Sequence, residues 1–470
     1  MRFFLTIVLL CCGFNGFSQT VTQKIDRAFS SLENDPQLKY SSSSLTVMNA
    51  NTAEILFSRN GDTGLAPAST LKTISAASAF HLLGSNFKWE TTLGYSGAIS
   101  AAGVLNGDLI LTGSGDPTLG SWRYETTKPD LLIKKWADAV HKSGIKRVSG
   151  RIIADDQLFG TQTLPPGWIW QDIGNYYGAG PNSLSWQENQ AELIFIAGAK
   201  AGDPTTFKMD DSEIFEVKIV NEVLTGSAGS GDQVYAFSSP YSNVIYLRGT
   251  YGIDLKKKIA ISVPDPALQL GHLLQKSLEK SGVTFGKMVK TSRQLEIENM
   301  AYQKAGNVIS VHTSPDLSQV IYWFNQKSIN LYGEHLLKTM ALKKELKVNT
   351  ENGTDLIKEF WKNKLGIDEN ALNIVDGSGL SPGNRITTKA MAMILQSAKK
   401  ELWFKEYFDS FPVYNNMKMK SGSINGVIAY TGYQTSASGT PLVFSIIINN
   451  YSGSGSLVRQ KMFRVLDNLK

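Results

Sequence analysis

The segment that organises this chain is Ala66-Pro67-Ala68-Ser69-Thr70-Leu71-Lys72, which continues to Leu83. Pro67 suits the lead-in to a helix, and Gly84 suits its end. Apolar or small residues recur between them at helical spacing, at Leu71, Ile74, Ser78 and Leu82. The spacing therefore predicts a mostly apolar helix that starts near Ser69 and ends at Gly84.

Lys72 stands three positions after Ser69, so one helical turn would place the amine beside the hydroxyl. A lysine among apolar side chains loses hydration, its pKa falls, and the neutral amine can accept the serine proton. The alternative is a buried helix whose lysine only extends to water. The spacing alone does not choose, because it recurs at Ser143 and Lys146, Ser277 and Lys280, and Ser397 and Lys400.

The composition bounds the class of protein. A chain of 470 residues that is 42% hydrophobic can fill more than one core, so two or three domains are expected. A net charge of +6 without long runs of like charge argues against a nucleic-acid partner. The five histidines lack the spacing of metal ligands, so we expect neither a metal nor another cofactor.

The first residues predict a secretory signal peptide over 1–18. Met1-Arg2 gives a positive start, Phe3 to Gly13 is apolar, and Gly16-Phe17-Ser18 offers a cleavage site. The apolar run is too short to span a bilayer, so no transmembrane segment is expected in the mature chain. Both cysteines, Cys11 and Cys12, lie in this run, which excludes a disulfide or a thiol nucleophile once it is removed.

Strands near both ends of the chain point to one shared sheet. Strands are predicted around a turn at 49–52 and again over 417–420, 427–433 and 442–449. Helices over 21–32 and 457–469 enclose them. We therefore expect an α+β fold in which an antiparallel sheet, flanked by helices, joins the two chain ends over 19–93 and 309–470.

The middle of the chain has a different texture. Helices over 131–140 and 268–278 alternate with strands over 105–111, 148–154 and 283–289. This predicts an inserted α/β domain over 94–164 and 263–308. Short β-branched and aromatic runs between them predict a second inserted, mostly β domain over 165–262.

Two further short segments complete a set with Ser69 and Lys72. Ser328-Ile329-Asn330 connects helices predicted over 317–324 and 331–343, and Lys420-Ser421-Gly422 ends an alternating strand. Other Lys-Ser-Gly triplets, at 142–144 and 280–282, are expected to end helices. Each triplet alone is weak, but this order of the three motifs occurs in β-lactamases and penicillin-binding proteins.

The chain resembles class C low-molecular-mass penicillin-binding proteins, the D-Ala-D-Ala carboxypeptidases of peptidase family S13. About 259 residues separate Ser69 from Ser328, similar to the two inserted domains of that family. Further segments look like that family's, namely Gly107-Asp108-Leu109, Gly115 to Leu119, Pro166-Gly167-Trp168, Tyr176 to Ala179 and Asp376 to Ser381. The resemblance implies a serine β-lactamase/transpeptidase-like main domain and an exported, periplasmic hydrolase.

The motifs suggest a role for each residue. Ser69 would be the nucleophile and Lys72 its base, and the backbone amides of Ser69 and, as the resemblance implies, of Ser423 would form the oxyanion hole. Ser328, bonded towards Lys72, would relay a proton to the leaving amine, and Asn330 would hold Lys72 or the substrate amide. Lys420 is the fifth predicted catalytic residue, and its ammonium would meet the terminal carboxylate of the substrate. The predicted substrate-binding residues are Ser421, Gly422, Ser423 and Asn425.

Asp376-Gly377-Ser378-Gly379 is left open between a simple glycine turn and a role beside the cleft. In relatives a basic residue is expected soon after this motif, to bind the acid group of the stem peptide. Here Pro382-Gly383-Asn384 comes before Arg385, so this part of the specificity is not assigned.

The function expected from the resemblance is a serine DD-peptidase acting on peptidoglycan stem peptides. It would act as a carboxypeptidase on D-Ala-D-Ala ends or as an endopeptidase on D-Ala-diamino acid cross-links, with β-lactams as covalent inhibitors. The alternatives are a β-lactamase or esterase of the same fold, and a non-catalytic cell-wall binding protein. A homodimer is compatible with the resemblance.

Overall fold

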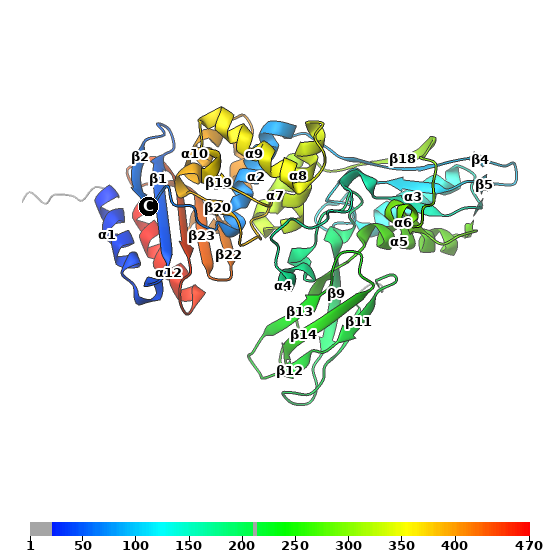
Figure 1. Ribbon diagram of the computed structural model, residues 1–470, viewed down its shortest axis with the longest axis horizontal. Helices are drawn as coiled ribbons and strands as arrows, with labels where there is room; N and C mark the ends of the chain where they lie inside the picture. The colour runs from blue at the N-terminus through cyan, green and yellow to red at the C-terminus, as the bar shows by residue number, and fades with distance from the viewer. Residues whose placement is uncertain (1–20, 210–213) are drawn as a thin grey trace, which may run out of the picture.

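The computed structural model describes residues 21–209 and 214–470. The predicted signal peptide over 1–18 lies outside these residues. Figure 1 shows a body on the left that holds the first described residues and the C-terminus, a second part beside it, and a β-rich part that projects below. Within the described ranges, no helix has the length and apolar character needed to cross a membrane.

The body is built on a six-stranded sheet in the order β2-β1-β24-β23-β22-β21, with every neighbouring pair antiparallel. Its strands are β1 (Ser42–Asn49), β2 (Ile55–Arg59), β21 (Val413–Tyr414), β22 (Met417–Ile424), β23 (Val427–Thr435) and β24 (Pro441–Asn449). β1 pairs with β24 along its whole length, from Ser42 opposite Asn449 to Asn49 opposite Leu442. The prediction that both chain ends share one antiparallel sheet is therefore confirmed.

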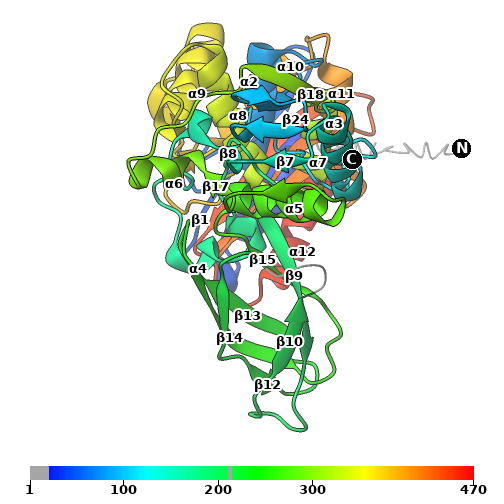
Figure 2. The ribbon, with the colours of Figure 1, turned by 90° about the vertical axis from the view of Figure 1, so that its right-hand side faces the viewer.

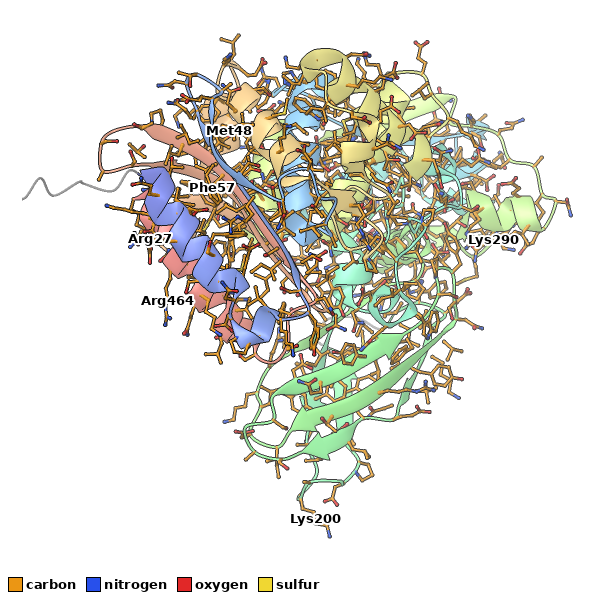
Figure 3. The ribbon with its side chains drawn as sticks, turned by 60° about the vertical axis from the view of Figure 1, so that its left-hand side comes forward. Arg27, Met48, Phe57, Lys200, Lys290 and Arg464 are labelled. Atoms are coloured by element: carbon orange, nitrogen blue, oxygen red, sulfur yellow. The ribbon has the colours of Figure 1, made fainter. Side chains whose placement is uncertain are left out.

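Helices cover both faces of this sheet. On one face lie α1 (Val21–Glu33) and α12 (Gly455–Leu466), side by side in Figure 3. The other face and the core beyond it hold α2 (Leu71–Leu83), α7 (Leu317–Lys327), α8 (Asn330–Lys343), α9 (Thr350–Leu365), α10 (Thr388–Ala398) and α11 (Phe404–Asp409). Val47 packs in the core between the sheet and α1 and α12, and its neighbour Met48 packs in the core on the opposite face, as the two-residue period of a strand requires.

In the second part of the molecule, the prediction of single strands over 105–111, 148–154 and 283–289 is wrong. Each of these segments forms a pair of shorter strands. The pairs are β5 (Val104–Asn106) and β6 (Leu109–Thr112), β7 (Arg147–Val148) and β8 (Ile152–Asp155), and β16 (Thr284–Phe285) and β17 (Lys290–Thr291). A glycine breaks each run, at Gly107, Gly150 and Gly286, where a Cβ atom would collide with a neighbouring backbone oxygen.

At these glycines the chain passes from one sheet to the next. The first members join a four-stranded sheet, β16-β7-β5-β4, and the second members join a five-stranded sheet, β17-β8-β6-β3-β18. The other elements here are β3 (Glu90–Tyr95), β4 (Ala98–Ile99), β18 (Asn307–Thr313), α3 (Pro129–Lys142), α5 (Pro266–Lys280) and α6 (Ser292–Ile297). Ser143 and Ser281 are the C-caps of α3 and α5, so the two other Lys-Ser-Gly triplets end helices as expected.

The β-rich part consists of two small sheets around one apolar core, and it projects from the rest of the molecule in Figure 2. Its strands are β9 (Gln190–Ile196), β10 (Thr206–Met209), β11 (Lys218–Asn221), β12 (Leu224–Gly226), β13 (Asp232–Phe237), β14 (Val244–Gly252) and β15 (Ile259–Ser262). The short helix α4 (Trp170–Ile173) packs against β13, and β19 (Leu372–Asn373) pairs with β20 (Arg385–Ile386) in the body. The predicted domain boundaries stay a prediction.

Short 3-10 helices connect many of these elements. They cover Pro36–Leu38, Ala68–Thr70, Gln157–Phe159, Tyr176–Gly178, Gln187–Asn189, Glu369–Ala371 and Asp467–Leu469. Two of them, Ala68–Thr70 and Tyr176–Gly178, contribute to the site described next.

Candidate active site

Ser69 lies in the 3-10 helix Ala68–Thr70, directly before α2 rather than in the first turn of α2. The turn is tight, because Ala68 has a left-handed backbone with φ of 46°. Gly379 packs against it, and a Cβ atom at Gly379 would collide with the Ala68 carbonyl oxygen. The close contact between the two backbones fixes Ser69 at the start of α2.

Lys72 is completely buried one turn further on. Its Nζ donates to Ser69 Oγ at 3.0 Å, to Asn330 Oδ1 at 2.6 Å and to the Ser378 carbonyl at 2.6 Å. Burial lowers the pKa of Lys72 to about 7, although the carboxylates of Asp376 and Glu334 act in the opposite direction. The amine beside Ser69 is therefore substantially neutral near neutral pH.

Asn330 is the first residue of α8 and has both ends of its amide occupied. Oδ1 accepts from Lys72, and Nδ2 donates to the Tyr177 carbonyl at 2.8 Å. These two partners fix the orientation of the amide, because only Nδ2 can donate to a carbonyl. Tyr177 comes from the inserted half of the chain, which thus supports the site directly.

Ser328 lies between α7 and α8 with a left-handed backbone, φ 57°. Its Oγ accepts from Lys420 Nζ at 3.0 Å, where the sequence suggested a bond towards Lys72. Lys420 is buried and also donates to the Ser421 carbonyl at 2.8 Å. Burial, with a smaller contribution from the charge of Lys72, holds the pKa of Lys420 well below its usual range. The three predicted motifs thus converge in space.

The strand β22 carries the remaining predicted residues. Gly422 packs on the turn that holds Ser69, and a Cβ atom there would lie 2.6 Å from the Pro67 carbonyl oxygen. Ser421 is half-buried, whereas Ser423 and Asn425 line a cavity of about 660 Å³. The cavity is lined by Ser69, Ile169, Gln171, Asp172, Tyr177, Tyr235, Ser328, Asn330, Leu380, Pro382, Ser423, Ile424 and Asn425. Lys72 and Lys420 lie behind its wall.

Comparison with known proteins gives the family of this chain. The sequence profile of the D-Ala-D-Ala carboxypeptidase 3 (S13) family matches residues 23–415 and 412–469, almost the whole chain. The chain belongs to this family. It is therefore a serine peptidase of the D-Ala-D-Ala carboxypeptidase type, as the sequence predicted.

Relatives match the S13 chain over most of its length. It is 29% identical to the D-alanyl-D-alanine carboxypeptidase of Actinomadura sp. (strain R39), over 92% of this chain and 82% of that protein. It is 25% identical to the D-alanyl-D-alanine carboxypeptidase DacB of Haemophilus influenzae, over 86% and 84% of the two chains. The crystal structure of penicillin binding protein 4 from Haemophilus influenzae has the same fold, with a TM-score of 0.79, 23% identity and coverage of 93% and 98%. The predicted fold class is confirmed.

The contacts of Asp376 show the role of the segment Asp376 to Gly379, which the sequence left open in this S13 peptidase. Its buried carboxylate accepts from the backbone N–H of Gly379 and Ser381, from Asn384 Nδ2 and from Trp168 Nε1, at 2.7 to 2.9 Å. The segment is thus a tight glycine turn and also part of the site, because its Ser378 carbonyl binds Lys72. The Arg385 guanidinium donates to the carbonyls of Pro382 and Asn384 in its own loop.

Sequence reasoning missed the residues that the inserted half contributes to the cavity, such as Gln171, Asp172 and Tyr235. Burial raises the pKa of Asp172, and the Tyr177 hydroxyl donates to it at 3.3 Å. Asp172 lies in the sequence between the family-like segments at 166–168 and 176–179, and this position could have indicated that it belongs to the site. Across 21–209 and 214–470, no cluster of three or more candidate ligands could hold a metal.

Proposed function

We propose that this protein is a serine DD-peptidase that hydrolyses the D-Ala-D-Ala end of peptidoglycan stem peptides through an acyl-enzyme on Ser69. The observation that carries the proposal is the 3.0 Å contact between Ser69 Oγ and Lys72 Nζ, a buried amine whose pKa is lowered to about 7. A neutral amine beside a hydroxyl that faces a cavity is the arrangement that activates a serine nucleophile.

The hydrogen bonds of Lys72 explain how it serves as the base. A neutral amine has two N–H groups and one lone pair. The two N–H groups match two carbonyl oxygens, those of the Asn330 amide and the Ser378 backbone. When Lys72 loses the proton that it donates to Ser69 Oγ, the lone pair left in its place faces the hydroxyl and takes the Ser69 proton as Oγ attacks the substrate carbonyl.

The neighbouring groups serve the next steps. The backbone amides of Ser69 and Ser423 would stabilise the oxyanion, and one such donor is typically worth about 3 kcal/mol of barrier. Ser328, which accepts from Lys420, would pass a proton to the leaving amine and be reprotonated from Lys420. Water then attacks the ester carbonyl and would give its proton to Lys420, which passed one on in the first step. Ser69 Oγ leaves the carbonyl carbon and takes back the proton held by Lys72, and the shortened peptide leaves as its carboxylic acid.

The strand β22 suits a peptide that ends in a carboxylate. β21 pairs with β22 only at Met417 and Lys418, so the rest of that edge has no strand partner among the described residues. An extended peptide can add to such an edge. Its carboxylate would meet the hydroxyls of Ser421 and Ser423, and its negative charge would favour the protonated form of Lys420 behind them.

The finer parts of the proposal concern substrates and location. Release of terminal D-alanine and cleavage of D-Ala-diamino acid cross-links both fit a nucleophile in an open cavity. β-Lactams would acylate Ser69 because they resemble the same peptide end. Residues 1–18 would direct export to the periplasm, and a homodimer stays a prediction that mass measurement in solution checks.

Labelling with a fluorescent penicillin tests the proposal. A stable adduct that disappears in Ser69→Ala, with unchanged thermal unfolding, is the expected result. Rapid turnover of the drug would instead favour a β-lactamase, and no adduct with the native protein would favour a non-catalytic binding protein. Incubation with monomeric and cross-linked stem peptides, with products identified by mass, then separates carboxypeptidase from endopeptidase activity.

A further inference from the structure

The strands β13 and β14 of the β-rich part carry aromatic side chains on their outer face. In this antiparallel pair Tyr235 lies opposite Arg248, and Phe237 lies opposite Tyr246. The alternate residues, Val234, Ala236, Ile245 and Leu247, are buried in the core beneath. The two-residue period therefore places Tyr235, Phe237, Tyr246 and Arg248 together on the side away from that core.

Trp170 of α4 extends this group, and α4 lies beside β13 in Figures 1 and 2. The rings of Trp170 and Phe237 are 6.2 Å apart between centroids. The Arg248 guanidinium lies 5.5 Å from the Phe237 ring and 5.6 Å from the Tyr246 ring, and it donates to Glu222 at 2.7 Å. We call Trp170, Tyr235, Phe237, Tyr246 and Arg248 the aromatic face.

The aromatic face is exposed although it is rich in rings. Trp170 is 55% exposed and Tyr246 is 41% exposed. Contiguous exposed rings of this kind mark a binding surface more often than a structural one. Glu222 balances the charge of Arg248, so the face suits a neutral ligand rather than a polyanion.

This face is continuous with the candidate active site. Tyr235 belongs to the face and also lines the cavity that contains Ser69. On either side of Trp170 in the chain, Ile169 and Gln171 line the same cavity. A ligand bound in the cavity and extended away from Ser69 on this side would pass directly onto the rings.

We propose that the aromatic face binds the glycan strand to which the stem peptide is attached, that is, a chain of N-acetylated hexoses. This inference rests on the proposed function, because a stem peptide held at Ser69 brings its sugar with it. A pyranose ring presents a C–H face that packs on aromatic rings, while its hydroxyl and acetamido groups bond to the polar edges of tyrosine and arginine.

Two substrates with the same stem peptide, one free and one attached to an N-acetylated disaccharide, test the inference in the full-length protein. Trp170→Ala and Tyr246→Ala should each raise KM for the sugar-bearing substrate by about tenfold and leave the free peptide unchanged, since each removes one stacking ring. Trp122→Ala is the matched control, because Trp122 is 49% exposed but lies outside this face. Equal KM changes for both substrates would overturn the inference.

A direct measurement keeps the result independent of catalysis. A β-1,4-linked tetramer of N-acetylglucosamine should bind Ser69→Ala calorimetrically and lose affinity when Trp170 or Tyr246 is also replaced. If the native protein is acylated by penicillin but no tetramer binds, the inference fails and the proposed function stands; without acylation, the proposed function fails. If the replacements instead change the mass in solution or the binding to phospholipid vesicles, the face serves self-association or a membrane, and the glycan inference is overturned.

Discussion

Both carboxylate oxygens of Glu334 accept the backbone N–H of Gly377, at 3.1 and 3.0 Å. Glu334 lies one turn after Asn330 on α8 and is buried. Gly377 precedes Ser378, whose carbonyl accepts from Lys72. One helix therefore supplies one hydrogen-bond acceptor of Lys72 and holds the loop that supplies another.

This relationship predicts a change in pH dependence for Glu334→Gln. Lys72 is faced by Asp376, Glu334 and Lys420, and the negative charge of Glu334 raises the pKa of Lys72. The replacement removes that charge, so the pKa of Lys72 should fall. The rate of acylation rises with pH as Lys72 loses its proton, and this rise should move to lower pH.

The measurement is the rate of labelling by a fluorescent penicillin between about pH 5 and 9. Burial raises the pKa of Glu334 to about 8, so its negative charge develops within this pH range, and Lys338 also faces it. The profile of the native protein is therefore recorded over the same range. Glu359→Gln, an exposed glutamate on α9, is the control. A rise that stays at the same pH in Glu334→Gln would show that this carboxylate only supports the loop.

Lys72→Arg should abolish acylation although it keeps a positive charge. A guanidinium does not deprotonate near neutral pH, so no base remains for Ser69, and the rate should fall by about a thousandfold or more. Mass spectrometry of the penicillin adduct gives the measurement. Lys418→Arg on β22 is the comparison, and acylation retained in Lys72→Arg would mean that another group is the base.

Gly422→Ala tests the close approach of β22 to the turn that holds Ser69. The new Cβ atom would lie 2.6 Å from the Pro67 carbonyl oxygen and 2.9 Å from the Ser69 nitrogen, so the strand must move. We expect slower acylation and a loss of about 1–3 kcal/mol in the free energy of unfolding. Gly306→Ala, where no atom lies within 4 Å, should change neither the labelling rate nor the urea midpoint.

Buried histidines predict that stability falls in mild acid. Burial lowers the pKa of His335 to about 3, and of His81 and His312 to about 4. The unfolded chain therefore binds more protons between about pH 6.5 and 4, so the free energy of unfolding decreases as pH falls through this window. Each group contributes a slope of about 1.4 kcal/mol per pH unit. Urea unfolding across this range should lose one such slope in His335→Gln.

Short local spacings revealed four of the five residues that converge, because Ser69 lies within one helical turn of Lys72 and Ser328 lies two positions before Asn330. The fifth, Lys420, was found from the Lys-Ser-Gly triplet that it begins. The Ser378 carbonyl was not predictable in the same way, since it reaches Lys72 across 306 positions. A backbone oxygen also leaves no trace in the residue type. The orientation of Asn330 likewise depends on the Tyr177 carbonyl, 153 positions away.

The helices α1, α3, α5 and α7 were predicted close to their observed bounds, because a buried stripe repeats along the sequence itself. The helices α9 and α10 were not predicted. The strand breaks at Gly107, Gly150 and Gly286 were missed for a different reason. Glycine in a strand is ambiguous until a second backbone is known to lie against it. At Gly107 that backbone is the Ser96 carbonyl, and at Gly286 it is the Ser149 carbonyl.

The pairing of β1 with β24 means that the central sheet can form only late in the synthesis of the chain. The helix that carries Ser69 is synthesised early, but the sheet beneath it lacks a central strand until Pro441–Asn449 has been made. A chain whose synthesis stops before that point contains Ser69 but lacks a central strand of the sheet that holds Ser69 in position. We therefore expect incomplete chains of this hydrolase to have no hydrolytic activity.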